Sequence, residues 1–252
     1  MRTLFFSGIL ALSYVARSQQ PVVTAPVVPV VPSVAAGTST AAPKTPAPGP
    51  DFAGLRNYAA DNAALPAHQE GRVVFYGDSI TYYWAHNSNF FPGKPYIGRG
   101  ISGHTTPQML IRFRQDVIDL HPAVVVILAG TNDIAGNQGP STLEMIENNL
   151  QSMAELGKAN GIQVILASVL PARDYPWRKG LEPAAKIKTL NAWIAEYCAN
   201  QKIIYLDYYS AMADTDGGMK PDLSKDGVHP TAEGYAIMES LAEKAIQTAL
   251  HE

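Results

Sequence analysis

Residues 72–79 read RVVFYGDS, a short apolar run that stops at a glycine and is followed by an acid and a serine. Similar runs follow at residues 123–129, 162–167 and 202–206, and a weaker one lies at residues 94–98. Continuous apolar runs of this length are typical of strands that are buried on both faces, as in parallel sheets. We therefore interpret the five segments as strands of one buried sheet.

Segments with helical periodicity lie between these strands. Apolar residues recur every three or four positions in residues 106–120, 141–158, 183–199 and 231–250. This spacing places them on one face of a helix. Alternating strands and helices predict an α/β fold, a three-layer α/β/α sandwich around a parallel sheet. Residues 51–68 are expected to form an N-terminal helix with a loose approach.

The first 50 residues differ in composition from the rest. Arg2 and the short apolar stretch after it predict a secretory signal peptide over residues 1–20, with an uncleaved membrane anchor as the alternative. Residues 21–50 hold eight of the 19 prolines, which favours an extended linker with little to bury. One folded domain is then expected over residues 51–252, in a protein that is secreted or periplasmic.

The composition excludes several classes of function. The chain has 252 residues and a net charge of −3, and this mildly acidic balance argues against nucleic acid as a partner. The single cysteine, Cys198, rules out an intramolecular disulfide and a multi-cysteine metal site. No apolar run after the N-terminus is long enough to cross a bilayer, so no stable membrane insertion is expected once the signal is removed. The sequence does not indicate an oligomeric state.

Polar residues follow the strands where the carboxyl ends of a parallel sheet form ligand sites. They fall in four groups: Gly77-Asp78-Ser79, residues 100–105, Gly130-Thr131-Asn132-Asp133, and residues 226–229 before the last helix.

These groups supply the parts of acyl transfer. A serine hydroxyl becomes nucleophilic when a histidine takes its proton, and a carboxylate must orient that imidazole. Ser79, His229 and Asp226 can fill these roles, because Asp226 and His229 are three residues apart. An oxyanion needs preorganised donors. The backbone N–H groups of Ser79 and Gly103 and the amide of Asn132 can supply three.

Each of these residues also has a structural interpretation. Ser79 can cap a helix, Asp226 and Asn132 can stabilise turns, and Gly103 can permit a tight turn. We expect Asp78 and Asp133, the aspartate of the third group, to make structural hydrogen bonds.

Taken together, the four groups resemble the four sequence blocks of the SGNH, or GDSL, hydrolases, over about residues 70–250. The resemblance implies a flavodoxin-like fold and a serine esterase without a cofactor. It implies Ser79 as nucleophile, His229 as base and Asp226 as its orienting acid, with Gly103 and Asn132 completing the oxyanion hole. This chain departs from the family at His104, where many members carry aspartate.

A second set of residues near these groups is expected to contact substrate. Aromatic rings beside such a site can line a pocket or stack on sugars, although on a helix they can equally belong to the core. The set consists of Asp78, Tyr82, Trp84, His104 and Trp177.

The sequence therefore predicts a secreted serine esterase for short acyl groups, acetyl above all, on a small-molecule or carbohydrate ester. A thioesterase or lysophospholipase of the same family is an alternative. So is a catalytically silent carbohydrate-binding module, although intact Ser79, Asp226 and His229 speak against it. A metal-dependent deacetylase would need paired metal ligands, and no such spacing is present. No metal or cofactor is expected.

Overall fold

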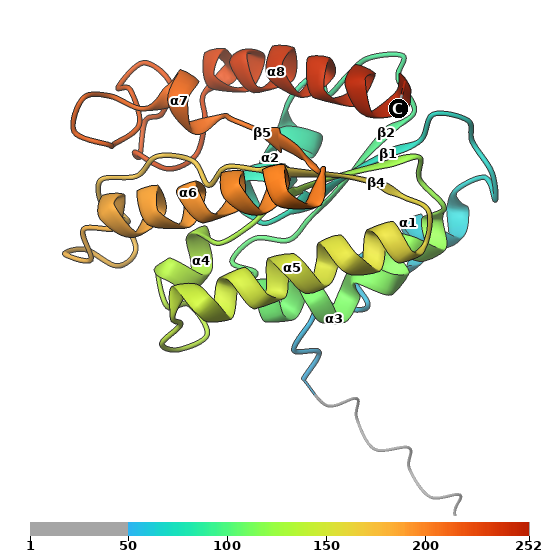
Figure 1. Cartoon of the computed structure of the whole chain (residues 1–252), viewed down its shortest axis with the longest axis horizontal. Helices are drawn as coiled ribbons and strands as arrows, with labels where there is room; N and C mark the ends of the chain where they lie inside the picture. Colours follow the sequence, from blue (N-terminus) through green and yellow to red (C-terminus); the bar gives the residue numbers. More distant parts are fainter. Residues whose placement is uncertain (1–49, 252) are drawn as a thin grey trace, which may run out of the picture. The chain divides into compact units, whose positions relative to one another are not determined.

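The computed structural model describes residues 50–251, which form a five-stranded sheet flanked by helices (Figure 1). The expected signal peptide and all but the last residue of the expected linker lie outside the described residues. The strands are β1 (Val73–Gly77), β2 (Tyr96–Gly100), β3 (Val124–Leu128), β4 (Gln163–Ala167) and β5 (Ile204–Leu206). The helices are α1 (Ala59–Ala64), α2 (Ser79–Asn87), α3 (Thr106–Asp116), the 3-10 turn η1 (Ile118–Leu120), α4 (Thr131–Ile134), α5 (Leu143–Ala159), α6 (Ala184–Gln201), α7 (Tyr209–Met212) and α8 (Ala232–His251).

The sheet has the order β2-β1-β3-β4-β5, and every neighbouring pair is parallel. Gly77 at the end of β1 pairs with Gly100 of β2 and with Leu128 of β3, so these three strands end level with one another. The chain moves outward from β1 in both directions, to β2 on one side and to β3 on the other. Ligand sites of open α/β sheets form at such a switch point, beyond the carboxyl ends of the strands.

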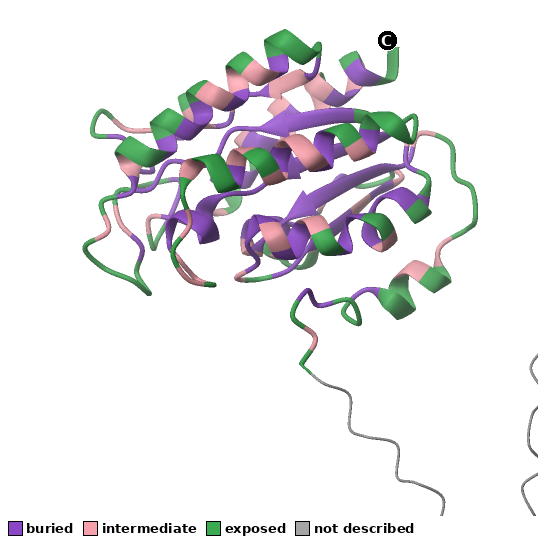
Figure 2. Cartoon of the chain, turned by 60° about the horizontal axis from the view of Figure 1, so that its bottom comes forward, coloured by how far each residue is buried: buried purple, intermediate pink, exposed green. Residues whose placement is uncertain are grey.

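Alternate residues of each strand enter two separate cores, one on each face of the sheet. Val74 and Tyr76 pack with apolar residues of α3, α5 and α6. Val73 and Phe75 pack on the other face with α2, α7 and α8. Figure 1 shows α8 on one side of the sheet and α3 and α5 on the other. Figure 2 shows strands that are mostly buried and helices that are buried along one side. The expected three-layer α/β/α architecture is confirmed.

The expectation of a helix over residues 51–68 is wrong in extent, because only Ala59–Ala64 is helical. The carboxylate of Asp51 accepts hydrogen bonds from the backbone N–H groups of residues 55 and 56 at 2.9 and 2.8 Å, which closes a turn at the start of the segment. Pro66 ends the helix, since the residue before a proline is driven to an extended conformation.

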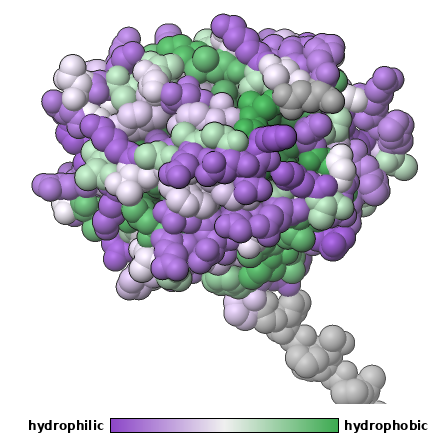
Figure 3. All heavy atoms as spheres, in the orientation of Figure 1, coloured by the Kyte–Doolittle hydropathy of each residue, from purple (hydrophilic) through white to green (hydrophobic). Residues whose placement is uncertain are grey.

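Hydrophilic residues dominate the face seen in Figure 3, and apolar residues appear there in separate patches. Within residues 50–251, no helix combines the length and the apolar character needed to cross a bilayer.

Helix α2 lies unusually close to the strands that precede and follow it. A Cβ atom on Gly100 would stand 2.3 Å from the backbone nitrogen of Tyr82 and 2.5 Å from the carbonyl oxygen of Asp78. A Cβ on Gly77 would stand 2.2 Å from the hydroxyl oxygen of Thr81. Only glycine at both strand ends allows the first turn of α2 to sit directly on the edge of the sheet.

Replacement of Gly100 by alanine should therefore destabilise the protein strongly. The atoms that a new Cβ would meet belong to the backbone of α2, so the helix would have to move, at a cost of about 3 kcal/mol in the free energy of unfolding. Gly161→Ala is the matched control, because Gly161 has φ +71° and no heavy atom within 4 Å of a new Cβ. That variant loses only the left-handed conformation, roughly 1–2 kcal/mol. Equal losses in chemical denaturation would contradict the close approach of α2.

Candidate active site

Ser79 is the first residue of α2 and lies directly beyond the end of β1. The residue before it caps the helix: the side chain of Asp78 accepts a hydrogen bond from the backbone N–H of Ile80 at 3.0 Å. Capping is thus the task of Asp78, and the Ser79 hydroxyl contacts another group. Its Oγ lies 2.9 Å from Nε2 of His229.

His229 comes from the loop before α8 and is held on its other side by Asp226. The Nδ1 atom of His229 lies 2.7 Å from Oδ2 of Asp226. The second carboxylate oxygen, Oδ1, accepts from the backbone N–H groups of Val228 and His229 at 2.9 and 2.8 Å, and from the hydroxyl of Ser224 at 3.1 Å. Both oxygens of Asp226 are therefore engaged, and the imidazole is fixed with Nε2 toward Ser79.

The electrostatics of Asp226 suit this contact. Partial burial would raise the pKa of its carboxyl, but the hydrogen bonds from the His229 side chain and from the backbone of His229 and Val228 outweigh it and lower the pKa to about 2. Asp226 is thus ionised throughout the neutral range. An ionised partner at Nδ1 favours the imidazole tautomer whose Nε2 accepts a proton from serine.

Gly103 and Asn132 follow the two neighbouring strands. Gly103 lies in the turn between β2 and α3 with φ +79°, and no heavy atom lies within 4 Å of the place where a Cβ would stand. Asn132 lies in α4, just after β3, and is 2% exposed. Its Nδ2 donates to the carbonyl oxygen of His104 at 3.0 Å and to Oδ2 of Asp78 at 3.2 Å, so its amide nitrogen lies beside the residue that precedes Ser79.

Asp78 and Asp133 are buried carboxyls that act through hydrogen bonds. Burial raises the pKa of each to about 6. Asp133 accepts from the backbone N–H of Thr106 at 3.0 Å and from its hydroxyl at 2.6 Å, which joins α4 to α3. Asp78 is 1% exposed and is committed to Ile80 and Asn132. The structural hydrogen bonds expected of Asp78 are present, and its contact with substrate stays a prediction.

His104 is likewise buried, at 8% exposure, and does not reach the surface as a substrate contact would require. Its Nδ1 accepts from Nε of Arg112 at 3.3 Å. Burial, together with this guanidinium, lowers the pKa of His104 to about 4, so the ring is neutral at physiological pH. The residue that departs from the family pattern thus serves as a neutral acceptor for Arg112.

Arg112 joins the ends of two strands to this histidine. Its side chain is fully buried and donates to the carbonyl oxygens of Gly77 and Arg99, both at 2.9 Å. Asp116 lies one helical turn further along α3 and balances the charge at 3.1 Å. The guanidinium therefore fixes the carboxyl ends of β1 and β2, from which Ser79 and Gly103 follow.

Two of the aromatic residues expected near substrate lie elsewhere. Trp84 is 2% exposed and packs among aromatic rings of the core, including Phe75 and Tyr235. The expectation of a substrate contact from Trp84 is wrong. Tyr82 stacks on His86, with ring centroids 4.2 Å apart, and lines a pocket that does not include the Ser79 and His229 side chains.

Two other rings flank His229. The Tyr83 ring lies edge-on to the imidazole, with centroids 5.3 Å apart, and the Trp177 ring lies at 6.2 Å. Tyr83 is 37% exposed and Trp177 is 44% exposed. Trp177 belongs to the loop between β4 and α6, where its ring stacks on buried Tyr175. Both rings therefore offer accessible surface beside the imidazole.

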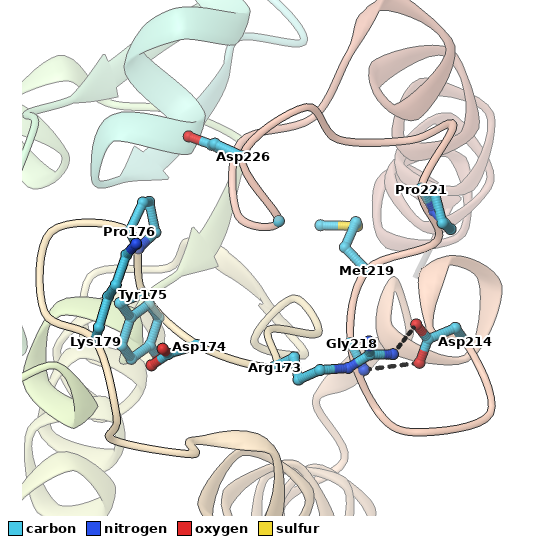
Figure 4. Close-up of a pocket in the computed structure, with 11 residues that line it drawn as sticks. Arg173, Asp174, Tyr175, Pro176, Lys179, Asp214, Gly218, Met219, Pro221 and Asp226 are labelled. Atoms are coloured by element: carbon cyan, nitrogen blue, oxygen red, sulfur yellow. Dashed lines mark hydrogen bonds and ion pairs between the residues drawn. The ribbon is translucent and has the colours of Figure 1, made fainter.

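A pocket of about 570 Å³ adjoins both the acid and the histidine and is lined by Lys225, Asp226 and residues 229–233. Two further pockets adjoin one of them each. One, of about 380 Å³, lies beside Asp226 between the loop of residues 173–179 and the loop of residues 214–227 (Figure 4). Arg173 closes its wall by pairing with Asp214 at 2.7 Å, as Figure 4 shows. The other, of about 510 Å³, lies beside His229 and is lined by Tyr83 and Tyr235. Among residues 50–251, no group of three or more potential metal ligands is present.

Sequence reasoning missed several residues of this site. Tyr83 could have been found, because it lies four residues after Ser79 on the same helix and so shares its face. Ser224 and Arg112 carry no comparable signal, since their contacts depend on how distant segments meet. The same holds for Asn137, whose Nδ2 donates to Oδ1 of Asn132 at 2.7 Å.

Comparison with known proteins gives consistent results. A model of the GDSL-like Lipase/Acylhydrolase family matches residues 75–237. The crystal structure of a GDSL-like lipase from Bacteroides thetaiotaomicron is 50% identical, with a TM-score of 0.76, and covers 79% of this chain and 100% of its own.

More distant similarities were also found. Esterase TesA of Pseudomonas aeruginosa is 27% identical over 134 residues, which are 53% of this chain and 60% of that protein. This chain thus spans less than two thirds of that curated relative. Axe2, an acetylxylan esterase from Geobacillus stearothermophilus, is 18% identical with a TM-score of 0.56, over 72% of this chain and 96% of its own, and shares the fold.

The low pKa of His104 predicts a specific dependence of stability on pH. The unfolded chain protonates this ring near its ordinary pKa of 6.5 and the folded chain only near 4, so the unfolded state binds more protons between these values. The contribution of His104 to the free energy of unfolding is present above pH 6.5. It is lost as pH falls toward 4, by on the order of 3 kcal/mol.

His104→Gln is the matched variant, because its side-chain oxygen can accept from Arg112 but cannot be protonated. Chemical denaturation of both proteins from pH 7 to pH 4 should show the wild type losing its advantage over the variant. Asp78 and Asp133 titrate in the same range with the opposite sign, but they are present in both proteins and cancel. Parallel profiles would contradict the burial of a neutral His104.

Proposed function

The chain belongs to the GDSL-like lipase/acylhydrolase family, a family of carboxylic ester hydrolases, and on that premise we propose that it is a serine esterase whose acyl group is carried by Ser79. The observation that carries the proposal is the unbroken line from Ser79 Oγ through His229 to Asp226, at 2.9 and 2.7 Å. Two segments far apart in sequence, one with Ser79 and one with both Asp226 and His229, bring these side chains together in the order that proton transfer requires.

The proposed reaction has two halves. Ser79 Oγ bonds to the ester carbonyl carbon while His229 Nε2 takes the hydroxyl proton. Collapse of the tetrahedral intermediate breaks the bond to the alcohol oxygen, which receives that proton from His229. A water molecule then attacks the acyl-enzyme with His229 again as base, and the acid leaves as Ser79 regains its proton. Asp226, ionised at neutral pH, stabilises the imidazolium in both halves.

The oxyanion would be stabilised by donors from three strand ends. The backbone N–H of Ser79 lies at the N-terminus of α2, where the helix dipole favours negative charge. The Gly103 N–H and the Asn132 amide are the other proposed donors. Both N–H bonds of Asn132 have acceptors in the free protein, so the oxyanion must displace one of them or share it.

Short acyl groups suit the surroundings of Asp226 better than long ones. The pocket beside it carries Arg173, Lys179, Asp174 and Asp214. A long alkyl chain placed there would remove charged groups from water without offering them a partner, which is unfavourable. We therefore propose acetyl and similarly short esters as substrates.

The alcohol part of the ester is proposed to carry a ring. His229 delivers the proton to the leaving oxygen, so the alcohol must lie near the imidazole, and there it meets Tyr83 and Trp177. Exposed aromatic rings at such a place favour flat or ring-shaped partners, such as sugars or aryl groups. An O-acetylated sugar meets both requirements.

A carbohydrate-binding module without activity would also use exposed rings, but it has no need of a hydrogen-bonded serine, histidine and acid.

We also propose that the enzyme is exported from the cytoplasm. The sequence pattern of residues 1–20 supports this proposal, with residues 21–50 as a linker.

Removal of the nucleophile should abolish ester hydrolysis. Ser79→Ala should lower kcat by on the order of 10³-fold or more, because no other group can form the acyl-enzyme. The measurement is hydrolysis of p-nitrophenyl esters from acetate to palmitate by both proteins, with chelator present throughout. Wild-type activity should peak at acetate or butyrate. Activity that persists in Ser79→Ala would contradict the role of Ser79, and a peak at palmitate would contradict the proposed acyl length.

Tyr83 should matter for the alcohol rather than for the acyl group. Tyr83→Ala should lower kcat/KM about 3- to 10-fold for p-nitrophenyl acetate and for an acetylated sugar, because a ring contact is lost. It should leave ethyl acetate unchanged. Tyr83→Phe is the control that keeps the ring. The same fractional loss on ethyl acetate would show that Tyr83 acts on His229 rather than on the alcohol.

A further inference from the structure

A continuous chain of hydrogen bonds runs from the accessible Trp177 to the buried Asn132. The indole Nε1 of Trp177 donates to Oδ1 of Asn137 at 3.0 Å, and Nδ2 of Asn137 donates to Oδ1 of Asn132 at 2.7 Å. The Nδ2 of Asn132 then donates to the carbonyl oxygen of His104 and to Oδ2 of Asp78. A single side chain, that of Asn137, thus connects a ring beside the imidazole to the amide proposed to bind the oxyanion.

The chemistry of the two ends gives this chain a single direction. An indole N–H can only donate, so the oxygen of Asn137 must face Trp177 and its NH₂ must face Asn132. The carbonyl oxygen of His104 can only accept, so it requires the NH₂ of Asn132 on its side. Both ends therefore demand the same orientation of both amides, and a flip of either amide would place two like groups against each other.

Asn137 is itself held in place by the segments on either side. Its backbone N–H donates to the carbonyl oxygen of Asn132 at 3.0 Å. Arg178, next to Trp177, donates to the carbonyl oxygens of Ala135 and Gly136 at 2.9 and 2.6 Å. The turn that carries Asn137 is thus attached both to α4 and to the loop that carries Trp177.

We propose that Asn137 is a positioning residue for the reaction, which holds the Asn132 amide nitrogen toward the start of α2 and is itself oriented by Trp177. The proposal rests on the proposed function, in which Asn132 donates to the oxyanion. Through this chain, an alcohol that packs on Trp177 restrains the same amide that stabilises the transition state. Asn137 acts on kcat through Asn132, with no contact to the substrate of its own.

A double-mutant cycle tests this coupling in the full-length protein. Asn137→Ala should lower kcat for p-nitrophenyl acetate about tenfold and change KM less than about twofold, because only the transition state uses the oriented amide. Asn132→Ala alone should cost roughly 10²-fold. In the Asn132→Ala background, Asn137→Ala should cost nothing further, since the amide that it orients is gone.

Two further variants complete the test. Asn137→Asp keeps the shape and the acceptor for Trp177 but places an oxygen against Oδ1 of Asn132, so it should lower kcat at least as much as Asn137→Ala. Its near-identical shape preserves the fold if alanine does not. Trp177→Phe keeps one aromatic ring and removes the N–H together with part of the indole surface. It should lower kcat severalfold in the wild type but not in Asn137→Asp, whose other amide contact is already lost.

The outcomes separate the two proposals. An unchanged kcat in Asn137→Asp, with Asn132→Ala impaired, would overturn the positioning role and leave the esterase intact. An equal loss from Asn137→Ala in both backgrounds would also overturn it, since Asn137 would then act independently of Asn132. Full activity of Asn132→Ala would instead overturn the oxyanion assignment on which the inference rests.

Discussion

The rest of the site depends on one buried guanidinium. Arg112 donates to the carbonyl oxygens at the ends of β1 and β2 and to the ring of His104, while Asp116 balances its charge. Buried carbonyl oxygens are costly without a partner. This side chain binds one at each of the two strand ends, and it shares that of Gly77 with the backbone N–H of Ile101. The same contacts hold the segments before Ser79 and Gly103 at a fixed separation from α3. A nucleophile and an oxyanion donor need such a fixed separation, because a displacement of about 1 Å between reacting groups costs catalysis heavily.

Two kinds of carboxyl divide the work around this framework. Asp226 is partly accessible and accepts four hydrogen bonds, so its charge is stabilised and its pKa lies near 2. Asp78 and Asp133 are buried, which raises their pKa values to about 6, and they fasten α2, α3 and α4 to one another. Asp226, which must face a developing imidazolium, thus lies where hydrogen bonds stabilise its ionised form. The acids that only join elements are placed where burial disfavours charge, and their hydrogen bonds compensate.

The sequence predicts the α/β/α fold well, because buried parallel strands leave continuous apolar runs and the helices leave a regular period. The sequence also predicts that its candidate site residues share one edge of the sheet, because the carboxyl ends of parallel strands meet there. These residues are Ser79, Gly103, Asn132, Asp226 and His229. Sequence-based prediction fails where the role of a residue depends on the direction in which its side chain points. Trp84 and Tyr83 are neighbours on one helix but lie on different faces of it. The side chain of Trp84 packs in the core, and that of Tyr83 lies beside His229. Sequence-based prediction also fails at residues 51–58, where a hydrogen-bonded turn at Asp51 replaces helical propensity.

The polar residues that sequence reasoning missed have one property in common: each satisfies a group that a more obvious residue leaves open. Ser224 donates to the Asp226 oxygen that His229 does not use through its ring, Asn137 donates to the oxygen of Asn132, and Arg112 donates to His104. No local sequence pattern predicts these residues, because their partners lie on other segments. They could nevertheless be anticipated as a requirement. An amide or carboxylate in a buried site presents one face to the substrate. Its remaining donors and acceptors then need hydrogen-bond partners in the protein, because without them the group could rotate. Orientation at the reacting atoms is therefore a property of the whole hydrogen-bonded set, and the residues that fix it need not touch the substrate.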